Sequence, residues 1–76
     1  MNLVISSHAR DRMARRYVSN AQIVAALNNG AFGTDHKGTY AMLPGKYPLV
    51  VPFDFDGGTL TVKTVFWKGK SDFAAA

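Results

Sequence analysis

The chain contains 76 residues, 47% of them hydrophobic, a length and composition that fit one small domain and exclude global disorder. It has no cysteine, which excludes disulfides and thiolate metal sites, and its net charge of +4 favours a polyanionic partner. The start lacks a basic n-region, and no apolar run approaches the roughly 20 residues of a membrane span, so we expect a soluble, cytoplasmic protein with no membrane partner.

Residues 3–6 can form a short first strand, followed by a helix that begins after Ser6 or Ser7 and ends near Arg16 or Tyr17. One stripe of this helix is apolar and should face the core. Its members are Ala9, Met13 and Tyr17. The neighbouring stripe carries basic residues at every fourth position, with Arg15 beside them, and consists of His8, Arg12 and Arg16. One face should therefore pack while the next one collects positive charge.

A second helix is predicted to begin after Ser19, because Ser19 and Gln22 have the spacing of a capping box. Its apolar side should be buried, and Gly30 stands where a left-handed residue would follow the last helical turn. Residues 30–38 contain three glycines, a composition typical of a mobile connection or a weak strand.

After this segment the hydrophobic period changes to two. Residues 40–43 and 49–55 read as strands, and Pro48 and Pro52 predict that the second of these lies at a sheet edge or carries a bulge. A hairpin should follow, leading into a central strand over residues 60–67 that is rich in Val, Thr and aromatic residues.

The predicted fold class is α+β, with two N-terminal helices packed on a C-terminal antiparallel sheet. We expect a single domain over residues 1–76, in which residues 69–76 form a frayed tail.

Residues 7–16 (SHARDRMARR), the helix end at 27–30 and the strand motif at 64–67 occur in an order that resembles small bacterial and phage domains of unknown function. These domains have an HAxxRMxxR helix and are similar to RelE/BrnT-type toxins, within the wider group of metal-independent ribonuclease folds. The resemblance spans residues 7 to about 67 and implies a RelE/BrnT-like fold. Such domains usually have a glycine after the arginine helix, where this chain has Tyr17 and Val18.

Metal-free RNA cleavage needs an acid–base group and cations around the phosphate. His8 is the best acid–base candidate because imidazole titrates near neutral pH, and Lys63 and Thr64 are candidate assisting groups. The candidate phosphate- or partner-binding residues are Arg12, Arg15, Arg16 and Trp67. The structural alternatives are that His8 completes the helix cap and that the arginines pair with aspartates. His36, alone in its loop, receives little weight.

The resulting hypothesis is an RNA-engaging, toxin-like domain, whose enzymatic form is a metal-independent endoribonuclease of a toxin–antitoxin or phage system. It requires no cofactor and no metal. The alternative is a non-catalytic interaction module that binds an acidic protein, an antitoxin or a host target, through its arginines. Whether the domain is an enzyme stays open on the sequence, because only His8 is a convincing acid–base group.

Overall fold

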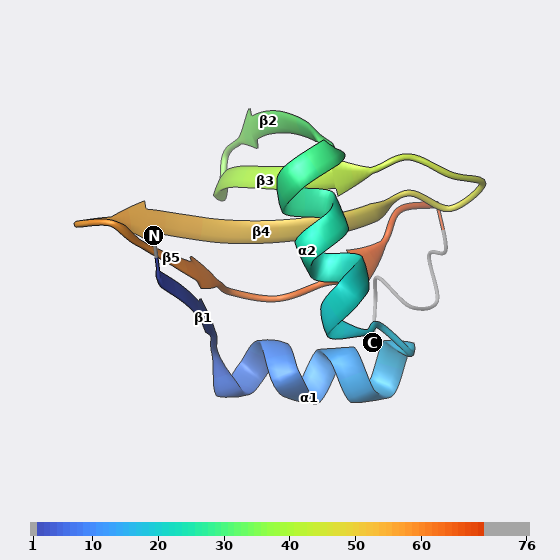
Figure 1. Ribbon diagram of the computed structural model, residues 1–76. Coiled ribbons are helices and arrows are strands. Elements are labelled where there is room, and N and C mark those ends of the chain that lie inside the picture. Colours follow the sequence, from blue (N-terminus) through green and yellow to red (C-terminus); the bar gives the residue numbers. More distant parts are fainter. Residues whose placement is uncertain (1, 70–76) are drawn as a thin grey trace.

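Residues 2–69 are described by the computed structural model, and they form two helices and six strands (Figure 1). The helices are α1 (Ser7–Arg16) and α2 (Asn20–Asn29). The strands are β1 (Asn2–Ile5), β2 (Ala31–Asp35), β3 (Gly38–Leu43), β4 (Leu49–Asp56), β5 (Thr59–Val62) and β6 (Phe66–Trp67). The fold is a small α+β fold. Neither helix has the length and apolar character that crossing a membrane would need. The predicted frayed tail lies outside the described residues, apart from Gly69.

The sheet is mixed, and the prediction of an antiparallel C-terminal sheet beneath an N-terminal helical half is wrong. The strand order is β1-β5-β4-β3-β2, and β1 runs parallel to β5, with Leu3 opposite Leu60. In the described chain, β1 therefore precedes the two helices and the other five strands follow them. Two parallel strands need a long connection between them, and here residues 6–58 form that connection. No short sequence pattern can therefore predict the pairing of β1 with β5.

The two helices have different relations to the sheet (Figure 1). α2 crosses the face of β3 and β4, whereas α1 runs along the side of the sheet nearest β1 and β5. Both helices contribute to one core cluster, through Ala9 and Met13 from α1 and Ile23 and Ala26 from α2. The layout with both helices on one face of a sheet is thus replaced by one covering helix and one flanking helix.

α2 begins as the sequence predicts and ends differently. Ser19 Oγ accepts the Gln22 backbone N–H at 3.2 Å, and Gln22 Oε1 accepts the Ser19 N–H at 2.8 Å, so the capping box is confirmed. Gly30 is extended, with φ −78°, and is not a left-handed cap. A side chain there would place its Cβ 2.5 Å from the Met42 carbonyl oxygen, so the close approach of β3 explains the glycine.

The proline-containing strand β4 lies in the middle of the sheet, so the edge alternative of the prediction is wrong. A bulge does occur in the pairing of β4, but the extra residue lies on the neighbouring strand. Pro52 accepts the Lys63 backbone N–H at 2.9 Å, so its nitrogen, which carries no hydrogen, faces the same neighbour. On that side β5 pairs as far as Val62 and β6 resumes at Phe66. Three residues, 63–65, thus stand opposite two of β4, 51 and 52, which is a β-bulge. The continuous strand predicted over 60–67 is wrong for this reason.

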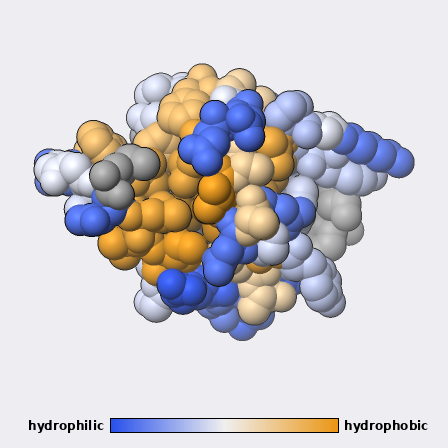
Figure 2. Space-filling view, viewed as in Figure 1, coloured by the Kyte–Doolittle hydropathy of each residue, from blue (hydrophilic) through white to orange (hydrophobic). Residues whose placement is uncertain are grey.

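The core face of the sheet continues beyond the part that α2 covers. Phe55 pairs with Leu60, and Leu60 pairs with Leu3, which makes one apolar row across three strands. Leu60 is buried, while Leu3 and Phe55 are exposed. Figure 2 shows hydrophobic surface gathered on this side, near the N-terminal end of the chain.

Tyr17, predicted to face the core, is 85% exposed. It adopts the left-handed conformation, with φ 57° and ψ 48°, and this conformation ends α1. Because the chain changes direction at Tyr17, the Tyr17 ring leaves the apolar stripe of α1, and the next residue, Val18, is buried instead. A left-handed residue after a helix favours glycine, so Tyr17 occupies a position that is strained for a side chain.

We predict that Tyr17→Gly stabilises the domain by about 1 kcal/mol, because a non-glycine residue is strained in this conformation and the exposed ring contributes little packing. For a domain of this size that gain raises the Tm by about 4–8 °C in a thermal melt. Tyr17→Ala is the matched control, since it removes the same ring and keeps the strain. An equal gain from Ala would contradict the backbone explanation.

Candidate functional site

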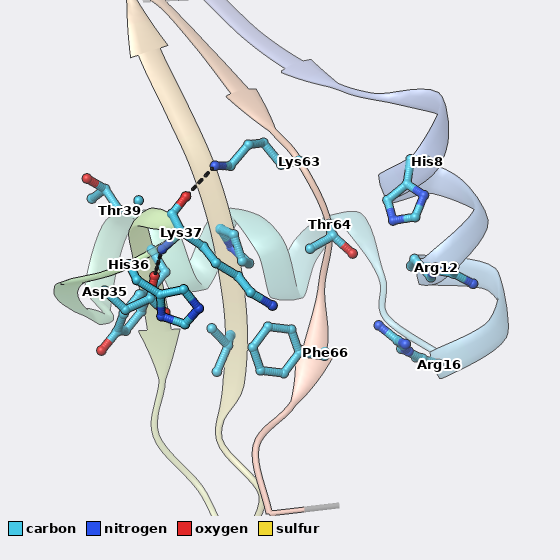
Figure 3. Close-up of a pocket in the computed structure, with 14 residues that line it drawn as sticks. His8, Arg12, Arg16, Asp35, His36, Lys37, Thr39, Lys63, Thr64 and Phe66 are labelled. Atoms are coloured by element: carbon cyan, nitrogen blue, oxygen red, sulfur yellow. Dashed lines mark hydrogen bonds between the residues drawn. The ribbon is translucent and has the colours of Figure 1, made fainter. Parts of the chain in front are cut away.

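A groove of about 520 Å³ opens on the face of the sheet opposite α2 (Figure 3). Side chains alternate along strands, so Ala41 and Val51 pack into the core and their neighbours Tyr40, Val50 and Pro52 face the groove. These three residues form its floor. α1 supplies one wall, the turn between β2 and β3 supplies the opposite wall, and the bulge lies between them.

The structure brings together most of the site residues chosen from the sequence. Five of them line the groove, namely His8, Arg12, Arg16, Lys63 and Thr64. The first three come from the basic stripe of α1, which presents them on one side of the helix at successive turns. Their catalytic and binding roles remain predictions.

Lys63 and Thr64 are consecutive, yet both line the groove. In a regular strand, consecutive side chains point to opposite faces, so only the bulge permits this arrangement. Lys63 Nζ donates to the Lys37 carbonyl oxygen at 3.1 Å and lies 3.6 Å from Asp54 Oδ1. The bulge thus directs an amine and a hydroxyl into one space and fixes the amine against the far wall.

α1 is attached to the bulge at both of its ends. At the start, Ser6 Oγ donates to the Lys63 carbonyl oxygen at 3.2 Å. At the end, Arg16 Nη1 donates to the Val65 carbonyl oxygen at 2.6 Å, and Trp67 Nε1 donates to the Arg16 carbonyl oxygen at 2.8 Å. These bonds hold one wall of the groove in a defined position relative to its base.

Arg16 belongs to the predicted basic stripe, yet it is buried, with 6% of its surface exposed. Burial lowers the pKa of its guanidinium from the ordinary value, and the nearby charge of Arg12 lowers that pKa further. An arginine side chain nevertheless stays protonated in proteins. The groove therefore concentrates positive charge at a cost, and a bound anion would offset that cost.

Arg15 and Trp67 are not among the residues that line the groove. Arg15 Nε donates to Asp11 Oδ2 at 2.9 Å on the exposed side of α1, and the same carboxylate lies 3.5 Å from Arg12 Nη1. Trp67 packs against the core cluster, and its indole nitrogen is used by the bond to Arg16. Trp67 is thus half-buried, lies outside the groove and holds the end of α1, and its predicted contact with a base or partner stays a prediction.

His8 does not complete the cap of α1. Ser6 is the N-cap, and its Oγ accepts the Ala9 backbone N–H at 3.0 Å. Within residues 2–69, the imidazole of His8 has no hydrogen-bond or ion-pair partner, and it points into the groove (Figure 3). The capping alternative is therefore wrong, and the ring is exposed and available.

The wall opposite α1 is formed by residues outside the site predicted from the sequence. Asp35, His36 and Lys37 line the groove from the tight turn between β2 and β3. The turn is ordered by Asp35 Oδ1, which accepts the Lys37 N–H at 2.8 Å, and by Gly38, whose φ is +124°. An Asp two residues before Lys-Gly, between two short alternating segments, is the signal that could have identified this hairpin.

Among the residues that the structure describes, no three His, Asp or Glu side chains are grouped so that they could hold a metal ion. The side chains that line the groove bring imidazole, guanidinium, amine, hydroxyl and carboxylate groups around one space.

We predict that Arg16→Ala destabilises the domain by about 1–3 kcal/mol, because the Val65 carbonyl would be left buried without its donor. Arg12→Ala should change the free energy of unfolding by no more than about 0.5 kcal/mol, because the Arg12–Asp11 pair is partly exposed and long. Urea denaturation of the two variants measures both values. Equal losses would show that Arg16 is not the clamp inferred from its geometry.

Comparison with known proteins adds one match. No curated protein and no solved structure is significantly similar to the chain. A family described as "Domain of unknown function (DUF4258)" matches residues 5–67, from the end of β1 to the end of β6. This stretch includes both attachments of α1 to the bulge and both walls of the groove. The chain therefore belongs to the DUF4258 family of domains.

Proposed function

We propose that this domain engages RNA in its groove and cleaves it without a metal ion, as a toxin-like endoribonuclease. The observation that carries the proposal is the convergence of an available imidazole, His8, with the cations of Arg12, Arg16 and Lys63 around one space. The resemblance of the α1 sequence to the HAxxRMxxR helix of small domains similar to RelE/BrnT-type toxins supports the same proposal. RNA of the cytoplasm is the substrate class that this reading assigns.

The residues divide into acid–base and anion-binding groups. His8 exchanges a proton with the ribose 2′-hydroxyl or with the leaving 5′-oxygen. Arg12 and Arg16 bind the phosphate, since a guanidinium offers paired N–H donors to phosphate oxygens. Lys63 and the Thr64 hydroxyl lie on the bulge between the two walls and stabilise the negative charge that develops on the phosphorus-bound oxygens.

The shape of the groove suits a short, single-stranded segment. Its volume lies within the range of small-ligand pockets, so it accommodates an unstacked nucleotide unit better than an intact duplex. Tyr40 on the floor and Phe66 beside the bulge give apolar surface against which a base can rest.

If RNA binds here, its affinity should fall steeply with salt, because neutralised phosphates release counterions. Three or four phosphate contacts predict a log–log slope of roughly −2 to −3 for single-stranded RNA. Fluorescence anisotropy with a labelled oligoribonucleotide measures the slope, and Arg12→Ala should reduce its magnitude by about 0.7. Lys68→Gln, which lies outside the groove, is the control. A flat salt response would contradict phosphate binding.

We predict that His8→Ala lowers RNA cleavage in EDTA by about 100- to 10,000-fold, the usual contribution of general acid–base catalysis. The melting temperature should stay unchanged, because His8 is exposed and has no bonded partner within the described residues. Cleavage assays and thermal melts on the same preparation test both statements. Undiminished cleavage by the folded variant would remove His8 from the mechanism.

A protein partner is the second candidate, favoured by a feature that RNA binding leaves unused. Leu3 and Phe55 expose an apolar row on the α2 side of the sheet, and exposed apolar rows on small domains mark sites of association. In this reading an acidic antitoxin or host protein contacts the arginines of α1 and the domain is not an enzyme. Three results together would favour the protein-partner function: His8→Ala still binds the partner, Arg12→Ala no longer binds it, and the wild type does not cleave RNA.

A further inference from the structure

We infer that His36 is the second acid–base group of the groove and acts with His8 as a pair on one phosphodiester. The inference rests on the proposed function and makes it more specific, because it assigns both proton transfers and names the product. It also restricts the substrate to RNA, since the reaction that such a pair catalyses needs a 2′-hydroxyl.

The first observation is the placement of the histidines. The chain has two, and they are 28 positions apart in sequence, at 8 and 36. Both line the same groove, His8 from α1 and His36 from the β2–β3 turn. Figure 3 shows the two imidazoles on opposite sides of the groove, with Thr64 and Phe66 on the bulge strand between them.

The second observation is that the turn carrying His36 is tied to the bulge. Lys63 Nζ donates to the carbonyl oxygen of Lys37, the residue next to His36, at 3.1 Å. Gly38 allows the shape of this turn, because its φ of +124° is a conformation that residues with side chains rarely adopt. α1 is bonded to the same bulge through Ser6 and Arg16. One segment, residues 63–65, therefore sets the positions of both histidine-bearing walls.

The charged groups around His36 suit the reaction. On its own turn lie Asp35, whose carboxylate is bonded to the Lys37 N–H, and the amine of Lys37. Lys63 faces His36 from the bulge and is also paired with Asp54. The wall formed by α1 contributes the charged side chains of Arg12 and Arg16 and the imidazole of His8. Cations outnumber carboxylates in the space between the histidines, which is the balance that a phosphate dianion-like transition state requires.

The reaction balances without any co-reactant. One imidazole removes the proton of the 2′-hydroxyl, and the bond from O2′ to phosphorus forms. The bond from phosphorus to O5′ breaks, and the other imidazolium gives its proton to the departing O5′. The products are a 2′,3′-cyclic phosphate and a free 5′-hydroxyl. The pair ends with its protons exchanged, and solvent restores the starting state.

The test compares wild type, His36→Gln and the control Lys68→Gln on a short oligoribonucleotide in EDTA, with thermal melts to show that each is folded. We expect wild type and the control to release a 2′,3′-cyclic phosphate end with a bell-shaped pH dependence. His36→Gln should cleave at least 100-fold more slowly and lose one limb of that profile. Its affinity for the same oligonucleotide with 2′-deoxyribose at the cleavage position should change less than threefold.

The possible results distinguish a failure of the histidine pair from a failure of the proposed ribonuclease function. Cleavage by wild type, with His36→Gln within threefold of it, would overturn the pair and leave the ribonuclease intact. Binding without cleavage by wild type would overturn both. A readout independent of activity is imidazole NMR with uridine 3′-monophosphate, which should shift the ring resonances of both histidines. A shift confined to the His8 ring would likewise overturn the pair. Full cleavage by both His36→Gln and a second variant, His36→Asn, would also overturn it.

Discussion

Proline carries no backbone N–H, and at Pro52 this missing donor faces the neighbouring strand in the middle of the sheet. The neighbouring chain segment pairs with β4 as far as Val62, forms a bulge at residues 63–65 and pairs again from Phe66. The bulge turns Lys63 and Thr64 to the same side, and it leaves the carbonyl oxygens of Lys63 and Val65 without partners in β4. Ser6 and Arg16 of the α1 region bond to these two oxygens. The groove thus owes its base, and the position of one wall, to a single imino acid.

This arrangement makes one arginine serve the structure and the site together. Arg16 lines the groove, but its Nη1 also satisfies a buried carbonyl, so substituting it changes the fold as well as the ligand contacts. Arg12 and His8 carry no comparable structural duty in the described chain. Functional experiments on the groove are consequently cleanest at His8, Arg12 and His36, and a loss of activity in an Arg16 variant has two physical explanations.

Local signals in the sequence were reliable where the interaction is local. The capping box of Ser19 and Gln22 and the every-fourth-residue stripe of α1 depend only on helix geometry, and both occur. The parallel pairing of β1 and the bulge at 63–65 depend on residues far apart in the chain, so no window of sequence contains them. Arg16 looked exposed because a guanidinium usually is, and its buried acceptor comes from Val65. His36 looked isolated because its companions belong to other elements.

β1 has a consequence for how the protein is made. It leaves the ribosome long before its hydrogen-bonding partner β5, and α1 bonds to residues 63 and 65, which emerge later still. The α1 wall of the groove lacks its bond to Val65 on a nascent chain that stops before residue 65, and the turn wall lacks its bond to Lys63 on one that stops before residue 63. The complete groove therefore forms only after residue 65 has been translated.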